Sequence, residues 1–578
     1  MIILGLNIFH ADTSASLFID NKLIAACEEE RFVKIKHFSG IPVNSIKHCL
    51  EVANLKITEV DFIAVNFNSK YNLLNKINFS VRNFNFSIIE KILSIRRKSK
   101  ILEMLDKLFF TKIGAKVIYI PHHISHISSS YLCSGIKEAI GLTIDGSGDF
   151  STAESYILKD NNIKIVEKIL YPHSLGIFYQ TFTQFLGFKN YGDEYKFMGL
   201  AAYGNPKYLN KLKNIIKYDE KGNFKLNLGF FNHQRTTINF QFEEGIPLFT
   251  NFYNQNFIEF FGKERSIDEK ITQYHKDLAA SVQKVFEDII INKLIYLSNK
   301  YKIKNLILSG GCFFNSVLNG KIHNLENYKS IFISPNVGDA GGGVGAALYL
   351  LSKQNNKFDN LKLSSPYLGS SYSNEYIKFE IIEALDLNES KTISYKYKEN
   401  FQDIYDLIAK ELTQNKIIGW FQDKAEFGPR ALGNRSLLGD PRNPNIQLII
   451  NEKIKKREEF RPFAPVIMED HYKDFFHQKY PSPYMNFVFK AKEKALNEIP
   501  GVVHVDGTSR VQTVNFEQNE KLYNLLKSFK KITDVPVLLN TSLNINEPIN
   551  NDPKTAYETF TKSNIDILVM QNYVFFKK

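Results

Sequence analysis

The sequence predicts a mixed α/β protein of two domains, and three observations support this fold class. Short apolar runs, such as residues 2–6 and 15–19, precede polar turns rich in glycine. Strand, polar turn and strand recur at residues 138–158, so a similar unit stands twice in the N-terminal half. Such duplication is typical of actin-like and RNase H-like folds. The length of 578 residues also exceeds what one compact core of ordinary size holds.

Each element of this fold follows from a local pattern. Apolar residues predict strands at 2–6, 15–19 and 23–28, and the first turn among them reads NIFHADTSAS. In the second unit the strand GLTI precedes the turn DGSGD, and the run NLILSGG at 305–311 opens into a helix. The clearest helix is expected at 271–296, where apolar residues recur at spacings of four and three, namely Tyr274, Leu278, Val282, Val285 and Ile289.

A change of composition divides the chain near residue 362. Residues 353–365 are polar and precede the sequence SPYLG, which indicates a boundary between domains 1–362 and 363–578. In the second domain, Asn443 and Pro444 form an N-cap and first-turn pair that predicts a helix. Its inward face would consist of Ile446, Ile450 and Ile454.

The composition excludes several classes of protein. A hydrophobic share of 44% and a charged share of 23% are those of a globular protein and not of a disordered chain. The four cysteines form no close pair, which argues against a disulfide framework and favours a reducing cytoplasm as the location. The first residues lack the basic start of a signal peptide, and no apolar run is long enough for a transmembrane segment.

The formal net charge of +12 lies mainly in one insertion. Residues 70–116 contain eleven Lys or Arg against three acidic residues, a net +8. This stretch is either a solvated helical insertion or a docking surface for an anionic acceptor or for peripheral contact with a membrane. We expect no nucleic acid as partner, because no base-stacking or DNA-reading module accompanies the charge.

The segment PHHISH at 121–126 is a candidate metal site. On a helix, His122 and His126 would lie on one face about 6 Å apart, whereas His123 would point elsewhere. Asp145 and Asp339 stand at two apparent strand ends and can complete the set. Two imidazoles with two carboxylates suit Fe(II), Mn or Mg better than a structural zinc ion. The alternative is a pair of structural histidines.

Three glycine-rich turns are candidates for nucleotide binding. Their backbone N–H groups can face phosphate oxygens. Each turn alone has an ordinary alternative, because glycine also permits tight turns and close helix packing. The residues proposed to bind nucleotide are Gly146, Gly310, Gly311 and Gly341.

Residues 428–463 are a third candidate site and contain eight basic residues against four acidic ones. Arginines in the sequences GPR and FRPFAP stand on rigid turns, where a guanidinium can bind phosphate or carboxylate through two hydrogen bonds. The alternative is a basic surface patch. We predict a convergent anion pocket that contains Arg430, Lys455, Arg461, Arg510 and Ser542.

The motifs together resemble those of a known family. They occur in the order HADTSAS, EEERF, PHHISH, DGSGD, YGDEYKFMGLAAYG, SGGCFFN, GDAGGGVGAA, FGPRALGNRS, FRPFAP, DGTSR and NTSLNINEPI. This order resembles the O-carbamoyltransferases of the nodulation and antibiotic-tailoring type over roughly residues 1–575. The resemblance implies an actin-like N-terminal domain, similar to tRNA threonylcarbamoyl transferase, and a C-terminal YrdC-like domain.

The resemblance also implies a two-step reaction. Carbamoyl phosphate and ATP, as Mg-ATP, would give carbamoyl-adenylate and pyrophosphate, and the carbamoyl group would then pass to a hydroxyl of a sugar, glycan or natural product. The metal, Fe(II), would be held by His122, His126, Asp145 and Asp339. Arg430, Lys455, Arg461, Arg510 and Ser542 match the pocket for carbamoyl phosphate and nucleotide.

The residues matched to the transfer step are His10, Asp12 and Lys36. Either His10 or Asp12 could be the general base, and Lys36 falls where the carbamoyl donor is contacted. The family has His and Asp adjacent, whereas Ala11 separates them in this chain. Asp193, Glu194 and Lys196 in YGDEYKFMG are either substrate contacts or parts of a polar loop.

Two other functions use similar folds or sites. A tRNA threonylcarbamoyl-adenosine enzyme would require threonine and bicarbonate in place of carbamoyl phosphate, and a non-catalytic nucleotide-binding scaffold would bind ATP without turnover. A hydrogenase-maturation enzyme is disfavoured, because four scattered cysteines cannot form its zinc motifs. Neither the acceptor nor the oligomeric state, a homodimer included, follows from the sequence.

Overall fold

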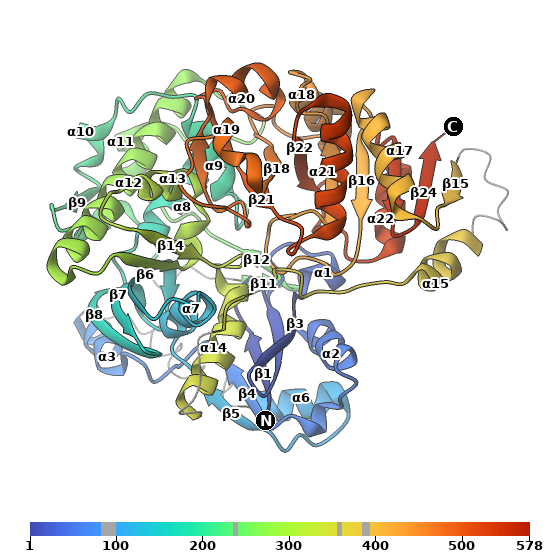
Figure 1. Ribbon diagram of the computed structural model, residues 1–578. Coiled ribbons are helices and arrows are strands. Elements are labelled where there is room, and N and C mark those ends of the chain that lie inside the picture. The colour runs from blue at the N-terminus through green and yellow to red at the C-terminus, as the bar shows by residue number, and fades with distance from the viewer. Residues whose placement is uncertain (83–99, 235–240, 355–360, 364, 384–392, 578) are drawn as a thin grey trace. The chain divides into compact units, whose positions relative to one another are not determined.

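The computed structural model describes residues 1–577 with five gaps, at 83–99, 235–240, 355–360, 364 and 384–392 (Figure 1). The chain divides into two compact units. The N-terminal unit consists of Met1–Glu30 and Lys36–Leu363, and the C-terminal unit of Arg31–Ile35 and Ser364–Lys578. The second stretch of the N-terminal unit therefore ends one residue beyond the position 362 expected from composition. Lys91, Arg96, Arg97 and Lys98 of the basic insertion lie outside the described residues.

The first half of the N-terminal unit is a five-stranded sheet in the order β3-β2-β1-β4-β5. Strand β1 pairs antiparallel with β2 and parallel with β4, so that Leu4 lies opposite Leu17 and Ile63. Residues 3–7 of β1 are all buried, as expected of a central strand that is covered on both faces. The strands are β1 Ile2–Asn7, β2 Ser14–Ile19, β3 Lys22–Glu28, β4 Phe62–Val65 and β5 Lys116–Tyr119.

The second half repeats this sheet, in the order β14-β13-β6-β7-β8. Strand β6 takes the place of β1, because it pairs antiparallel with β7 and parallel with β13. The strands are β6 Glu138–Gly148, β7 Ser151–Lys159, β8 Asn162–Leu170, β13 Asn305–Ser309 and β14 Ser330–Ile333. Two sheets with one strand order and one set of directions form a duplicated actin-like fold, and the predicted fold class is confirmed.

The turn DGSGD differs from its prediction. Strand β6 continues through Asp145 to Gly148, and the chain reverses only at Asp149 and Phe150. Both residues of the reversal have positive φ angles, of 49° and 71°. Asp145 therefore projects from a strand and not from a free loop.

Two helices of the N-terminal unit, α7 His122–Tyr131 and α14 Asp339–Gln354, pack against each other (Figure 1). Helix α7 also contacts β6 and β13, whereas α14 contacts β1, β2 and β4. Their approach depends on glycine, because a Cβ atom on Gly345 would lie 1.8 Å from the carbonyl oxygen of Ser125. The glycine run of α14 thus permits close helix packing.

The predicted long helix is confirmed as α12 Gln273–Tyr301, which extends five residues beyond the predicted end. Leu278, Val282, Val285 and Ile289 of its apolar stripe are buried, and Tyr274 is half-buried. The other helices of at least seven residues in the described part of this unit are α2 Val43–Val52, α3 Leu73–Arg82, α6 Ile101–Phe109, α8 Leu175–Phe185, α9 Glu194–Ala201, α11 Gln255–Phe261 and α13 Ser316–His323.

The C-terminal unit contains an eight-stranded mixed sheet in the order β15-β24-β23-β16-β17-β22-β18-β21. Helices α17 Phe401–Thr413 and α21 Glu520–Thr533 lie side by side (Figure 1). The strands are β15 Ile393–Tyr397, β16 Ile418–Phe421, β17 Arg435–Gly439, β18 Ala464–Met468, β21 Gln512–Val514, β22 Val537–Ser542, β23 Ile567–Met570 and β24 Tyr573–Lys577. A separate two-stranded antiparallel sheet pairs β19 Val488–Lys490 with β20 Thr508–Arg510. In the described part of this unit the remaining α-helices of at least six residues are α20 Glu493–Glu498 and α22 Pro553–Lys562.

The helix predicted at Asn443–Pro444 begins later, as α18 Ile446–Ile450. The Asn443 side chain caps a turn and not the helix, since it accepts a hydrogen bond from the backbone N–H of Asn445 at 2.9 Å. A π-helical turn, Asn451–Lys455, follows directly. The inward face is confirmed, because Ile446, Ile450 and Ile454 are buried.

A short excursion of the N-terminal sequence belongs to the C-terminal unit. Arg31, in α1 Glu30–Val33, is buried and donates a hydrogen bond to the carbonyl oxygen of Gly428 at 2.6 Å. Nothing in the sequence marked residues 31–35 as part of the second unit.

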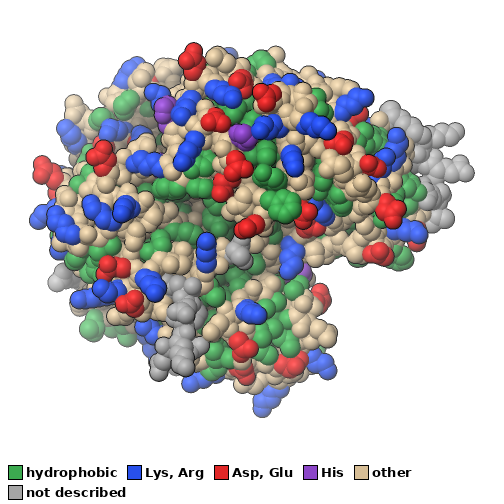
Figure 2. Space-filling model, in the orientation of Figure 1, with side chains coloured by type: hydrophobic (Ala, Val, Ile, Leu, Met, Phe, Trp, Pro, Cys, Tyr) green, Lys and Arg blue, Asp and Glu red, His purple; other side chains and the backbone are tan. Residues whose placement is uncertain are grey.

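One face of the molecule carries charges of both signs (Figure 2). On the face in Figure 2, Lys and Arg side chains alternate with acidic ones instead of forming one basic area. Within the described residues no helix combines the length and the apolar character needed to cross a bilayer.

Candidate functional site

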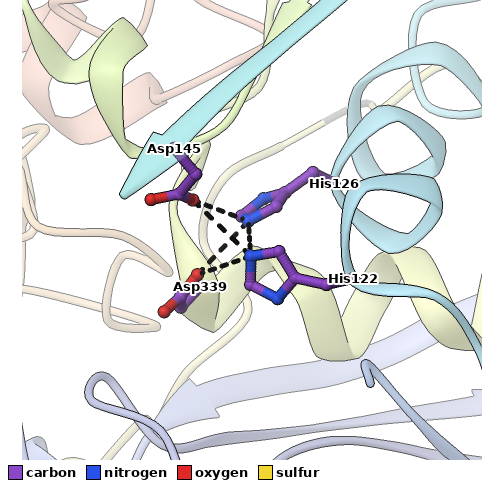
Figure 3. Close-up of side chains that lie close together, drawn as sticks. All are labelled: His122, His126, Asp145 and Asp339. Carbon is purple, nitrogen blue, oxygen red and sulfur yellow. Dashed lines mark hydrogen bonds and ion pairs between the residues drawn. The ribbon is translucent and has the colours of Figure 1, made fainter. Parts of the chain in front are cut away.

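The N-terminal unit gathers two histidines and two aspartates at one point (Figure 3). His122 and His126 lie one turn apart on α7, with their Nε2 atoms 3.0 Å from each other. The carboxylates come from β6 and from the first turn of α14, and the four ligand atoms all lie within 4.8 Å of one another. We name His122, His126, Asp145 and Asp339 the His2Asp2 cluster.

Opposite charges hold the His2Asp2 cluster together. His126 Nε2 lies 2.9 Å from Asp145 Oδ2 and 3.2 Å from Asp339 Oδ1. Burial alone would lower the pKa of His126, but hydrogen bonds to the two carboxylates raise it to about 9. The same bonds to the histidines outweigh burial and hold the pKa of Asp145 well below its usual range. The cluster therefore attracts positive charge, whether protons or a metal ion.

The surrounding chain fixes the two imidazoles. A Cβ atom on Gly148 would lie 2.0 Å from the ring of His122, so glycine makes room for that ring. Asp149 accepts the backbone N–H of His122 at 2.8 Å, at the start of α7. His123 points away, as predicted, and its Nδ1 lies 2.8 Å from Thr143 Oγ1. Asp339 was predicted to stand at the end of a strand, but in the structure it is the first residue of helix α14.

The glycines proposed to bind nucleotide use their amides within the chain. Gly146 and Gly311 donate to the Asp145 carboxylate, at 2.6 and 3.2 Å. Gly310 donates to Val337 O at 2.9 Å and Gly341 to Gly338 O at 3.1 Å. Contact of these four amides with phosphate would require an exchange of those hydrogen bonds.

Of the residues matched to the transfer step, His10 lies near the His2Asp2 cluster. The ring of His10 is 5.9 Å from that of His122, between centroids. Asp12 instead pairs with His37, Oδ1 to Nδ1, at 2.7 Å. Lys36, directly before His37, has an exposed side chain. The structure thus joins Asp12 to a histidine that the sequence did not single out.

The segment YGDEYKFMG, predicted as a possible polar loop, contains the start of helix α9, and its charged residues differ in their surroundings. Asp193 and Lys196 form an ion pair of 2.9 Å one helical turn apart, which indicates a structural role. Glu194 is different, because burial raises its pKa to about 7. Its carboxyl group therefore titrates near neutral pH.

The C-terminal unit gathers guanidinium groups. Arg510, at the end of β20, lies in the field of three others, and burial together with these like charges holds its pKa well below the usual range. Within the described residues its Nε atom is buried and makes no hydrogen bond. Burial also lowers the pKa of Arg430 to about 10. We name Arg430, Arg457, Arg461 and Arg510 the arginine cluster.

Arg457 belongs to the arginine cluster although no role was assigned to it from sequence. Its Nε donates to Asn451 Oδ1 at 2.7 Å, and its guanidinium lies 4.8 Å from the ring centroid of Phe463. Seven other charged or polar residues surround it at 451–459, and such a run is typical of a solvated surface, so the sequence did not distinguish Arg457.

Lys455 and Ser542 come together, but the ammonium group is already satisfied. Lys455 is buried and donates to Ser542 O at 2.6 Å and to Asn544 O at 2.9 Å. The side-chain oxygens of both partners lie within 3.3 Å as well. Arg435 is similarly internal, with hydrogen bonds to the carbonyl oxygens of Gln422, Asn434, Ser370 and Asp423. These hydrogen bonds give both basic side chains a structural role in the C-terminal unit.

Comparison with known proteins gives matches along most of the chain. A family model described as carbamoyltransferase N-terminus matches residues 2–348, and one described as carbamoyltransferase C-terminus matches residues 409–577. Nodulation protein NolNO of Sinorhizobium fredii is 33% identical over 99% of this chain and 80% of its own length. An uncharacterized protein of Synechocystis is 34% identical over 100% of this chain and 96% of its own.

Among solved structures, HypF of T. kodakarensis aligns with 63% of this chain and 49% of that chain, at 12% identity and a TM-score of 0.31. The full-length sequence matches bear out the resemblance that the ordered motifs indicated. This chain belongs to the carbamoyltransferase family.

Proposed function

We propose that the protein is an ATP-dependent O-carbamoyltransferase that acts on a hydroxyl of a sugar, glycan or natural product. Water would cleave carbamoyl phosphate to carbamate and phosphate, and carbamate would attack the α-phosphorus of ATP to give carbamoyl-adenylate and pyrophosphate. The carbamoyl group would then pass to the acceptor. The observation that supports this most is the arginine cluster, in a chain of the carbamoyltransferase family. Its four like charges are ready to bind an anion.

The arginine cluster suits phosphate chemistry. Guanidinium forks bind phosphate oxygens through two hydrogen bonds. The buried Nε of Arg510 needs an acceptor, which a phosphate oxygen would supply. Fixed positive charge would also stabilise the transition state as carbamate attacks the α-phosphorus of ATP, because phosphoryl transfer depends mainly on positioning and electrostatics.

The His2Asp2 cluster fits a divalent metal ion. Its two imidazole nitrogens face each other at 3.0 Å, and one nitrogen pair with two carboxylates is a ligand set for Fe(II) or Mn. When bound, such an ion would supply Lewis acidity toward an oxygen of the adenylate or carbamoyl group. The chain itself orients the ligands through Gly148 and Asp149.

The transfer step requires a proton acceptor for the hydroxyl. His10 and Asp12 lie in the turn between β1 and β2, and both are half-buried. Burial raises the pKa of Asp12, although His37 opposes this, and a more basic carboxylate is a better proton acceptor.

The four cysteines are free in the structure, which supports a cytoplasmic location.

The test is release of pyrophosphate from ATP and carbamoyl phosphate by the purified protein. Arg461→Ala should abolish it, because one guanidinium of the arginine cluster is lost. Arg442→Ala is the matched control, since Arg442 pairs with Asp440 at 2.6 Å and lies outside the cluster. Release that survives Arg461→Ala would contradict the proposed pocket. Dependence on threonine and bicarbonate in place of carbamoyl phosphate would indicate the tRNA-modifying alternative.

A further inference from the structure

Three segments far apart in the sequence meet around one imidazole of the N-terminal unit. They are the turn after β1, the stretch that ends in His37, and the loop before α9. His37 Nδ1 lies 2.7 Å from Asp12 Oδ1, and the ring of Tyr191 stacks edge-on against that of His37 with centroids 5.0 Å apart. None of these contacts is local, so the sequence alone did not bring them together.

The backbone around the Asp12–His37 pair is fixed on both sides. Thr13 N–H donates to Phe38 O and Phe9 N–H to Gly40 O, each at 2.9 Å. These bonds tie the turn after β1 to the loop that contains His37. Asp12 and His37 both have positive φ angles, of 58° and 57°, which only a specific turn on each side can maintain.

The far edge of the imidazole is also enclosed. A Cβ atom on Gly192 would lie 2.3 Å from His37 Nε2, so glycine is required there for the ring to fit. The backbone N–H of His37 donates to Glu30 Oε2 at 2.9 Å. The ring therefore has one orientation, with Nδ1 toward Asp12.

The carboxylate of Asp12 keeps one oxygen for another partner. Among the described residues His37 is its side-chain hydrogen-bond partner, through Oδ1. The Asp12 side chain retains 25% exposure, so Oδ2 can reach a solvent-borne hydroxyl. His10, the other candidate base, faces His122 of the His2Asp2 cluster instead.

The charged groups around His37 favour its protonated form. Asp12, Glu30 and Glu194 all act on it, the Tyr191 ring stacks edge-on against it, and the Asp339 carboxylate adds to the field at Asp12. Burial would lower the pKa of His37, but the carboxylates, Asp12 foremost, raise it to about 9. An imidazolium beside a carboxylate is therefore the state at neutral pH.

We propose that His37 is a positioning residue for carbamoyl transfer: its imidazolium holds Asp12 so that the second carboxylate oxygen takes the proton of the acceptor hydroxyl. This inference rests on the function proposed above. The hydroxyl oxygen forms the new bond to the carbamoyl carbon, and the bond from that carbon to the AMP oxygen breaks. AMP leaves as the phosphate anion, the proton goes to Asp12 and then to solvent, and His37 stays protonated.

The experiment compares His37→Gly with the wild-type protein. Glycine adopts the φ of 57° without strain and leaves a cavity of the shape of imidazole. Pyrophosphate release reports adenylation, and AMP release reports transfer, with water and added glycerol as the probe hydroxyls. We expect pyrophosphate release within about twofold of wild type and AMP release about 100-fold lower.

Added imidazole separates positioning from packing. At subsaturating concentration it should restore AMP release at least about tenfold, and less so as the pH rises above about 6.5, where free imidazole loses its charge. The proposal would be overturned if imidazole did not restore AMP release, or if it restored AMP release equally at every pH. His471→Gly is the matched control, because His471 pairs with Asp474 at 3.4 Å in the C-terminal unit, and imidazole should not change its activity.

Two further measurements keep the proposal falsifiable. An NMR titration should place the pKa of His37 near 9 and shift it toward 6.5 in Asp12→Asn; an unchanged value would overturn the pairing. Metal content should be equal in wild type and His37→Gly, and loss of one equivalent would show that Asp12, Glu30 and His37 hold a cation instead. A wild-type protein that releases no pyrophosphate would contradict the proposed function itself, and this inference with it.

Discussion

The His2Asp2 cluster and the arginine cluster differ in how far the chain itself compensates their buried charges. The first sets two carboxylates against two imidazoles, so the chain itself compensates each charge. The second sets four guanidinium groups together with one partner charge, since Arg461 Nη1 lies 3.5 Å from Glu458 Oε2, and Arg510 Nε makes no hydrogen bond within the described chain. A compensated site is stable before its ligand arrives, whereas a site with an excess of like charge is stabilised further when an anion binds.

The two sites also differ in how much the neighbouring chain contributes. The His2Asp2 cluster stands on regular elements, with the histidines on α7 and the aspartates on β6 and α14. The arginine cluster stands on irregular segments, with Arg430, Arg457 and Arg461 in loops and Arg510 at the end of the short strand β20. A site on rigid elements keeps its geometry without ligand, and loop residues are freer to close on one.

The largest expected effect is on stability at the compensated site. Asp145→Asn removes one carboxylate that faces both histidines, so the free energy of unfolding should fall by about 3 kcal/mol, measured by urea denaturation. Asp160→Asn is the control, because Asp160 is exposed and its φ of 46° suits asparagine. Equal stability of the two variants would show that the carboxylate is not part of a compensated set.

A substitution in the arginine cluster should lower activity without lowering the free energy of unfolding. Arg510→Gln should lower pyrophosphate release about 100-fold, equivalent to about 2.7 kcal/mol of transition-state stabilisation. Its unfolding free energy without ligand should stay equal or rise, because repulsion among like charges is relieved. A loss of stability as large as that of Asp145→Asn would remove the contrast between the two clusters.

Substitution of Lys455 tests whether this residue belongs to the arginine cluster. Its ammonium is bonded to oxygens of Ser542 and Asn544, so it resembles the compensated site although it lies in the C-terminal unit. Lys455→Met should lower the unfolding free energy by about 2 kcal/mol, since buried oxygens would lose their donor. Thermal unfolding with and without inorganic phosphate would check this, and an unchanged midpoint would place Lys455 with the arginines instead.

The smallest expected effect is a pH dependence of stability in the N-terminal unit. His37 has a pKa of about 9 in the fold and about 6.5 when unfolded, so its contribution is fully present below about pH 6.5 and is lost as the pH rises through 9. Because the side chain is partly exposed, we expect about 1 kcal/mol. Urea denaturation at both ends of this range should show a smaller pH effect for His37→Asn; identical pH profiles would argue against the ion pair with Asp12.

Local pattern was enough to predict much of the N-terminal unit. The apolar runs that became β1, β2 and β3 were recognisable because their residues are largely buried, and the long stripe of α12 because burial of one helix face imposes a period on the sequence. The pairing of His122 with His126 followed from the geometry of one helical turn. These are properties of neighbours along the chain.

The errors have a common cause in tertiary context. Asp339 was placed at a strand end because it follows an apolar run, but the glycines after it form a helix that packs on α7. Those glycines were also predicted to bind nucleotide; in the structure they permit close packing, and their contact with nucleotide stays a prediction. Lys455 was predicted to bind phosphate, and this too stays a prediction beside its hydrogen bonds to Ser542 and Asn544, which no sequence pattern reveals.

The sequence by itself determined the fold class, the family and the members of the His2Asp2 cluster, because each depends on periodicity, helical spacing or ordered motifs. Only the tertiary structure decided that Asp12 pairs with His37, that Arg457 joins Arg510, and that residues 31–35 belong to the C-terminal unit. Those choices depend on contacts between segments far apart in the chain, whose partners no local pattern specifies.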